Sequence, residues 1–134
     1  MSGYVYVARN KAFADLVKVG FTTRTVQARM AELNSTGVPG QTSAVYYAVT
    51  SEAHRLEQLT HTALRTVRES KNREFFAITA AEARRVIRRS AALGDIVISA
   101  EWSDKSVDLE DRSVRLAKAK QAVFKNLLKP TRFK

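Results

Sequence analysis

Two short apolar runs near the start of the chain constrain its fold most strongly. Gly3–Ala8 (GYVYVA) and Leu16–Phe21 (LVKVGF) both alternate with the two-residue period of a β-strand. In such strands Tyr4 and Tyr6 lie on one face and the valines between them on the other. A hairpin of the two strands would gather both phenols and the ammonium of Lys18 on one surface.

The following segments predict helices around a small sheet. Thr25 caps a helix with Val26, Met30 and Leu33 on one face, and Thr79 with Glu82 forms a capping box for another. Further elements are a strand at residues 44–50, a helix at 51–68 and an extended segment at 73–78. The fold class is therefore α+β: a mainly antiparallel sheet of about three strands, flanked by helices, with a C-terminal helical extension.

Charge divides the chain into three parts. Residues 1–90 hold 14 cationic and 7 acidic side chains, residues 91–111 hold one and six, and residues 112–134 hold eight cations and no acid. We expect a folded basic domain, an acidic connector and a basic helical tail over these ranges. The last helix, about 107–128, has an apolar stripe that either packs back on the domain or pairs with a second copy, so monomer and homodimer stay open.

The composition limits the classes of binding partner that we expect. The net charge of +10 favours a polyanion, with DNA first and RNA not excluded. No apolar run approaches the ~20 residues that span a bilayer, no secretory signal is visible, and cysteine is absent. We expect a cytoplasmic protein without a membrane partner.

Five motifs occur in order along the first 90 residues. They are Gly3–Tyr6, Lys18–Thr22, Ser35–Pro39, Glu57–His61 and Arg73–Phe76. Their order resembles the GIY-YIG nuclease superfamily, and most closely a small subfamily common in phages and bacteria. That resemblance implies a phage or bacterial endonuclease that hydrolyses DNA phosphodiester bonds by water attack at one divalent ion, Mg²⁺ or Mn²⁺.

The resemblance also implies roles for individual residues. Tyr6 would help to activate the attacking water, Arg29 would be the catalytic arginine, and Glu57 would hold the metal, with Glu74 as a second choice. Tyr4 would be a support or a substrate contact.

Two positions depart from the wider superfamily. Lys18 stands where that superfamily has a tyrosine, and it would deprotonate water, contact phosphate or orient another group. The histidine expected after Arg29 is missing, so His61 would substitute for it from the long helix. Asn72 would match a late asparagine of the superfamily.

The chemistry of these residues fits phosphodiester hydrolysis. Such a reaction needs an activated water and neutralisation of the developing oxyanion charge. Mg²⁺ held by one carboxylate and several waters suits these tasks, and Arg29 supplies a fork of donors to phosphate oxygens. A tyrosine has a reference pKa of ~10, so Tyr6 as a base requires a nearby cation, from Lys18 or a metal-bound water.

Other cations would contact the nucleic-acid backbone, with the arginines of the helix after Thr79 mostly on its solvent side. The predicted contacts are Arg24, Arg84, Arg85, Arg88, Arg89, Lys118 and Lys120. Two alternatives stay open: a catalytically weak or inactive nucleic-acid-binding module of the same fold, and a basic protein–protein adaptor. Residues 129–134 are expected to be disordered.

Overall fold

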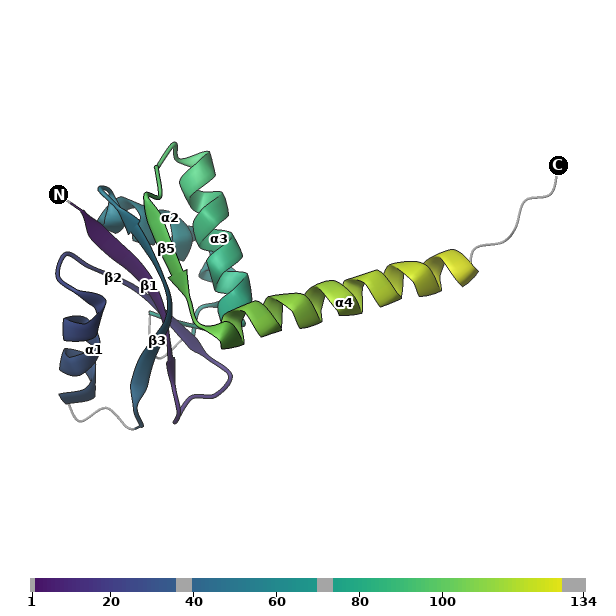
Figure 1. The fold of residues 1–134 in the computed structure, drawn as a ribbon, viewed down its shortest axis with the longest axis horizontal. Coiled ribbons are helices and arrows are strands. Elements are labelled where there is room, and N and C mark those ends of the chain that lie inside the picture. The colour runs from purple at the N-terminus through teal and green to yellow at the C-terminus, as the bar shows by residue number, and fades with distance from the viewer. Residues whose placement is uncertain (1, 36–39, 70–73, 129–134) are drawn as a thin grey trace.

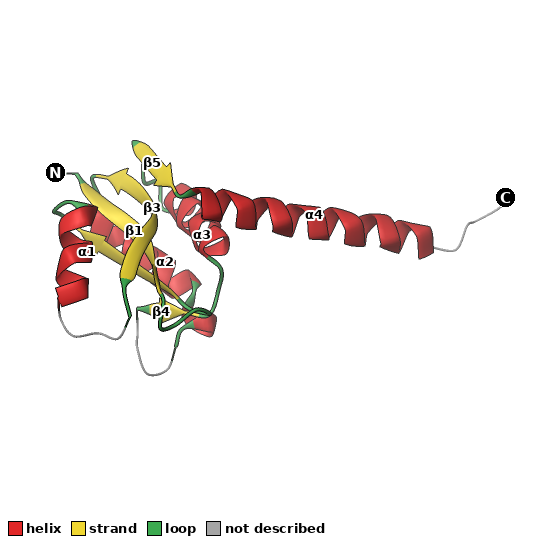
Figure 2. Ribbon diagram, turned by 60° about the horizontal axis from the view of Figure 1, so that its bottom comes forward, coloured by secondary structure: helices red, strands yellow, loops and turns green. Residues whose placement is uncertain are grey.

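A computed structural model describes residues 2–35, 40–69 and 74–128, and it confirms the α+β class (Figures 1 and 2). In chain order the elements are β1 (Gly3–Asn10), β2 (Val17–Thr22), α1 (Val26–Ser35), β3 (Thr42–Thr50), α2 (Ala53–Ala63), a 3₁₀ turn (Arg65–Val67), β4 (Phe75–Phe76), α3 (Ala80–Leu93), β5 (Ala100–Ser103) and α4 (Lys105–Leu128).

The described strands form one antiparallel sheet in the order β4-β2-β1-β3-β5. About three strands were predicted, and the structure has five. The central three are the predicted ones, while β4 and β5 extend the sheet at its two edges. Both added strands are short, two and four residues, so neither has the alternation that identifies a strand from sequence.

The hairpin register confirms the predicted faces. Tyr4 lies opposite Thr22, Tyr6 opposite Gly20, and Ala8 opposite Lys18, so the two phenols and the ammonium share one face. Helix α1 lies against this face, and α2 and α3 cover the other one (Figure 1). The main apolar core lies between the sheet and these two helices.

The helix starts follow the predicted capping chemistry at two sites. The Thr25 hydroxyl accepts from the Ala28 amide, and the Thr79 hydroxyl accepts from the Glu82 amide, each at 3.1 Å. Val26 and Met30 are buried as expected.

The predicted helix span of 51–68 is too long, since α2 begins at Ala53 and ends at Ala63. Its buried residues are Ala53, Leu56, Glu57 and Thr60. The polar Glu57 can be buried because it lies against the open backbone edge of β2, and the buried Thr60 hydroxyl donates to the Leu56 carbonyl.

Ion pairs fasten β5 and the start of α4 to the rest of the body. Arg84 bonds Asp108, Arg85 bonds Asp111, Arg88 bonds Glu101, and Arg9 bonds Glu110. The prediction that the α3 arginines mostly face solvent is wrong for Arg84, whose side chain is 7% exposed. A buried guanidinium requires partners, and Asp108 and Ser103 provide them.

Beyond its first turns, α4 projects away from the body (Figures 1 and 2). Its apolar stripe is exposed: Leu109, Leu116, Val123 and Leu127 are 59%, 56%, 59% and 76% exposed. The stripe therefore does not pack back on the domain, which was one of the two options. None of the helices in the described ranges is both long and apolar enough to cross a bilayer.

Some sequence-based expectations fall outside the described residues. They concern Asn72, Arg73, positions 36–39 of the third motif, and residues 129–134.

Asp111→Asn tests the clamp between α3 and α4. The hydrogen bond from Arg85 holds the pKa of the Asp111 carboxyl below its usual 3.8, with Arg115 and Arg84 adding to the effect. A lowered pKa stabilises the folded state above the unfolded-state pKa and loses that effect as pH falls through the folded-state value. Thermal melts should show Asp111→Asn less stable than the parent at pH 7.

The difference in melting temperature should shrink below pH 3.8. Asp15→Asn removes an exposed carboxylate and serves as the control. Equal melting temperatures for the parent and Asp111→Asn at pH 7 would contradict a stabilising clamp.

Candidate functional site

The ring of Tyr6 lies directly against the backbone of Gly20 on the neighbouring strand. A Cβ atom at Gly20 would stand 2.5 Å from the Tyr6 hydroxyl and 2.6 Å from Cζ, closer than non-bonded atoms approach. Glycine is therefore needed at position 20, because only its bare backbone leaves room for the buried ring. Packing of the Tyr6 ring thus explains the glycine of the Val-Gly motif in β2.

Arg29 is the cation that contacts Tyr6. Its guanidinium reaches from α1 and hydrogen-bonds the phenol oxygen, and its Nη1 also donates to Glu32 Oε2 at 3.1 Å. Burial raises the pKa of the Tyr6 phenol above 10, and the bond and charge of Arg29 offset only part of that rise. Tyr6 is therefore a neutral phenol at physiological pH.

Lys18 does not supply the positive charge that was expected beside Tyr6. Lys18 is 7% exposed, and its ammonium bonds the carboxylate of Glu74, which precedes β4. It also lies 5.6 Å from the ring centre of Phe75. Because a buried ammonium needs an anion, Lys18 is neutralised locally, and Arg29 takes the place next to the phenol.

Glu57 and His61 occupy the open edge of β2 past the end of β4. They are four residues apart on α2, on one helix face. The Glu57 carboxylate accepts a hydrogen bond from the Phe21 amide, and the His61 Nε2 donates to the Val19 carbonyl at 2.7 Å. The two side chains therefore complete hydrogen bonds that a further strand would otherwise make.

The Glu57 carboxylate is in an unfavourable place for a negative charge. Glu57 is 9% exposed as a residue, and burial raises the pKa of its carboxyl above the usual 4.5; the charge of His61 offsets part of this rise and that of Glu74 adds to it. The charges of Glu57 and Glu74 also raise the pKa of Tyr6. These groups therefore lie within electrostatic reach of one another at the β2 edge.

The donor set fits a magnesium ion better than a metal with an all-protein cage. Within the described ranges, no cluster of three or more histidine or acidic side chains could hold a metal alone. Mg²⁺ keeps several waters and needs one or two carboxylates, and a buried carboxylate with a raised pKa gains from a cation beside it. Glu57 is the residue that fits this role.

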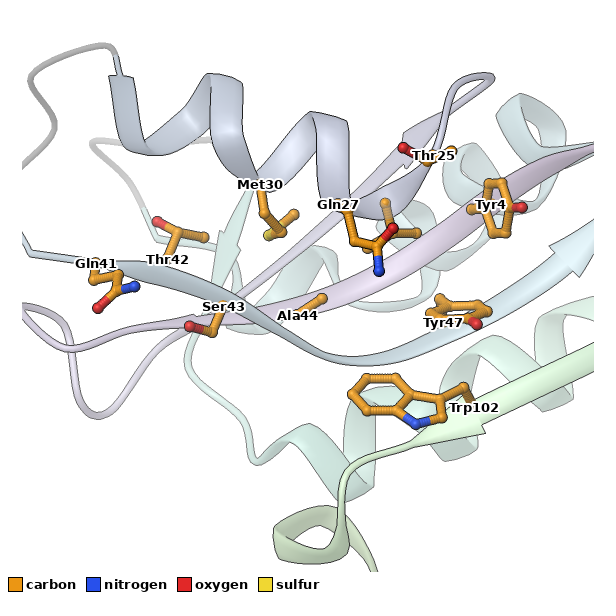
Figure 3. Close-up of a pocket in the computed structure, with 11 residues that line it drawn as sticks. Tyr4, Thr25, Gln27, Met30, Gln41, Thr42, Ser43, Ala44, Tyr47 and Trp102 are labelled. Carbon is orange, nitrogen blue, oxygen red and sulfur yellow. The ribbon is translucent and has the colours of Figure 1, made fainter.

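Tyr4 lies apart from Arg29 and Glu57, in an aromatic row. Its ring meets that of Tyr47 edge to face at 5.4 Å, and Tyr47 stacks on Trp102 of β5 at 5.6 Å. The row lines a groove between α1 and strands β1, β3 and β5 (Figure 3). Sequence reasoning missed Tyr47 and Trp102, although Trp102 is the single tryptophan of the chain.

The predicted backbone-contacting cations are scattered. Arg84, Arg85 and Arg88 are bound to carboxylates of β5 and α4, as described above. Arg89 is exposed on α3, and Lys118 and Lys120 are exposed on the projecting part of α4. Arg24 is closest to the candidate site, since it shares Glu32 with Arg29.

Comparison with known families matches residues 3–91 to the T5orf172 domain. The chain belongs to the T5orf172 domain family. This finding corrects the assignment to the GIY-YIG superfamily: Lys18 in place of a tyrosine and the missing histidine were departures from that pattern. T5orf172 membership indicates a nucleic-acid-related, nuclease-like function without specifying a reaction. No curated protein and no solved structure matched the chain.

The T5orf172 range contains Tyr6, Arg29 and Glu57, but it ends before β5. The chain therefore adds Trp102 to the domain from outside the matched range.

A double-mutant cycle tests the packing of Tyr6 on Gly20. Gly20→Ala should destabilise the fold by about 1–3 kcal/mol in chemical denaturation, because the buried ring cannot move away from the new methyl group. In a Tyr6→Leu background, which has no ring to displace, the same substitution should cost clearly less. An equal loss of stability from Gly20→Ala in both backgrounds would show that the loss does not arise from a clash with the Tyr6 ring.

Proposed function

We propose that this protein is a divalent-metal-dependent endonuclease that hydrolyses phosphodiester bonds of DNA. The observation that supports the proposal is the juxtaposition of Tyr6, Arg29 and Glu57 around Gly20. These residues come from β1, α1 and α2, and each has a group suited to a phosphate or its metal. A packing role alone does not explain why a guanidinium, a phenol and a buried carboxylate meet at one strand edge.

Arg29 would bind the scissile phosphate. Its planar guanidinium has donors left beyond those used for Tyr6 and Glu32, and charge-assisted bonds to phosphate oxygens strengthen as negative charge develops. Glu32 keeps the guanidinium oriented before the substrate arrives. Arg24, which also pairs with Glu32, would add a second cation for the neighbouring backbone.

In the free protein, Tyr6 would act as a hydrogen-bond donor and not as a base. Its raised pKa keeps the phenol protonated at neutral pH, so in the free protein it can donate a hydrogen bond to water or phosphate oxygen. Its ring is fixed by Gly20, so the hydroxyl has a defined position.

Glu57 would hold Mg²⁺ through carboxylate oxygen not committed to the Phe21 amide. When bound, Mg²⁺ would supply Lewis-acid stabilisation of phosphate charge and a more acidic water. Glu74 would instead keep Lys18 in place, since the two are already paired.

A second candidate is nucleic-acid binding without turnover. The neutral Tyr6 phenol and the local neutralisation of Lys18 by Glu74 favour it, because neither group is prepared as a base in the free protein.

Glu57→Gln separates the two candidates. With supercoiled plasmid and Mg²⁺, the parent should nick the DNA, and the variant should do so at least about 100-fold more slowly, since it loses the metal ligand. Glu52→Gln, at the start of the same helix, removes an exposed carboxylate paired with Arg55 and should leave the rate unchanged. Salt-sensitive retardation of the plasmid with no nicking in any variant would support the binding module.

Metal binding can be measured without turnover by thermal melts at several pH values. Because its raised pKa favours the protonated form in the folded state, ionised Glu57 destabilises the fold once pH exceeds 4.5. Without metal, Glu57→Gln should therefore melt above the parent at pH 8 and level with it at pH 4. Mg²⁺ at a hundred times its Kd should stabilise the parent by about 2.7 kcal/mol at pH 8.

The variant should gain no such stabilisation from Mg²⁺. An equal Mg²⁺ effect on the parent and on Glu57→Gln would remove Glu57 from the metal site.

A further inference from the structure

A groove lies between α1 and the sheet, and its lining includes none of Tyr6, Arg29 and Glu57. It has a volume of about 680 Å³, within the size range of small-molecule sites. Its floor is the aromatic row Tyr4, Tyr47 and Trp102, and its opposite wall is α1 (Figure 3).

The aromatic row places apolar ring surface at the groove, with Trp102 partly exposed to solvent. Trp102 and Tyr47 are nearly parallel, with an angle of 26° between their planes, and Trp102 is 42% exposed. Tyr4 closes the row at 84° to Tyr47. A large indole with this exposure offers a free π-face to a planar ligand.

The rest of the lining is uncharged and mixes apolar side chains (Val26, Met30 and Ala44) with amides and hydroxyls. None of the described residues that line the groove carries a charge, and Gln27 on α1 directs its amide into the space above the sheet (Figure 3). Gln41, Thr42 and Ser43 add further amide and hydroxyl groups along β3. Such groups suit the hydrogen-bonding edge of an uncharged heterocycle, and they offer no counter-ion for a phosphate.

The distance between the groove and Tyr6 matches the spacing of nucleotides along a strand. Tyr6 pairs with Tyr47 across β1 and β3, and Tyr47 pairs with Trp102 across β3 and β5. Two strand spacings place the backbone of Trp102 roughly 10 Å from that of Tyr6. A stacked strand rises ~3.4 Å per nucleotide, so this separation corresponds to two or three nucleotide steps.

We infer that this groove binds an unpaired nucleobase, stacked on Trp102 and Tyr47, of a strand whose phosphate lies at Arg29. This inference rests on the proposed function and adds the substrate class: nucleic acid that is single-stranded or has an extruded base two or three nucleotides from the cleavage position. A base within a duplex is stacked on both faces and cannot occupy the groove. Since β5 lies beyond residues 3–91, this preference is added to the T5orf172 domain by the segment that follows it.

The single tryptophan of the chain makes the test direct. The full-length protein is kept in EDTA, so that no strand is cut, and titrated with a short oligodeoxythymidylate strand. A base stacked on the indole should quench its fluorescence, whereas a strand of equal length and charge made of abasic sites should not. A fully paired duplex of the same length should also leave the emission nearly unchanged.

Affinity is then measured by anisotropy of a dye-labelled strand. Trp102→Ala should bind the thymidylate strand about 5- to 100-fold more weakly and the abasic strand as the parent does. Trp102→Phe keeps a stacking face and should stay within about threefold of the parent. Val97→Ala removes another exposed apolar side chain and is the matched control.

Equal quenching by the abasic strand, or unchanged binding by Trp102→Ala, would overturn the inference. If Trp102→Ala does not fold, the comparison of strands with the parent and with Trp102→Phe still decides the matter. Absence of plasmid nicking by the parent protein would count against the proposed hydrolysis alone, because the fluorescence signal needs no metal and no turnover.

Discussion

The contact between the Tyr6 ring and the bare backbone of Gly20 determines how the candidate site is built. It allows a buried phenol on β1 to reach across β2, where the strand edge is open and α2 supplies Glu57. Arg29 then approaches the phenol from α1, which lies on the sheet face that carries Tyr4 and Tyr6. Groups from both sides of the sheet therefore lie within electrostatic reach of one another at one edge, and a side chain at position 20 would displace the Tyr6 ring from it.

Much of the charge in the described residues forms ion pairs that hold the fold together. Lys18 is neutralised by Glu74, and the arginines of α3 hold β5 and α4 through Glu101, Asp108 and Asp111. The acidic segment that was expected to be a connector is in this way bound to the basic body. Among the described residues, cations outside these ion pairs include Lys11, Arg65, Arg89 and the lysines of the projecting α4, so the net charge of +10 overstates the charge available at the candidate site.

The sequence predicted the central hairpin, its two faces and the order of elements, because alternation and capping are local signals. It predicted an extended segment at 73–78, which contains β4, but not that this segment pairs with β2 or that β5 pairs with β3, because such pairing depends on distant strands. It also could not show that Lys18 meets Glu74 while Arg29 meets Tyr6, since burial and competition between partners decide such pairings. The family assignment made from the five motifs was wrong, because residues 3–91 match the T5orf172 domain. Trp102 was missed because β5 becomes part of the groove only when it pairs with β3.

The central claim is that a divalent ion binds at the β2 edge through Glu57. Paramagnetic broadening of backbone amide resonances by Mn²⁺ tests it most directly, because the amide of Phe21 donates to that carboxylate. At low Mn²⁺ occupancy, the account predicts that the amides of Gly20 and Phe21 broaden first, and that Glu57→Gln abolishes this. Broadening centred instead on the acidic start of α4 around Asp108, unchanged in the variant, would contradict it.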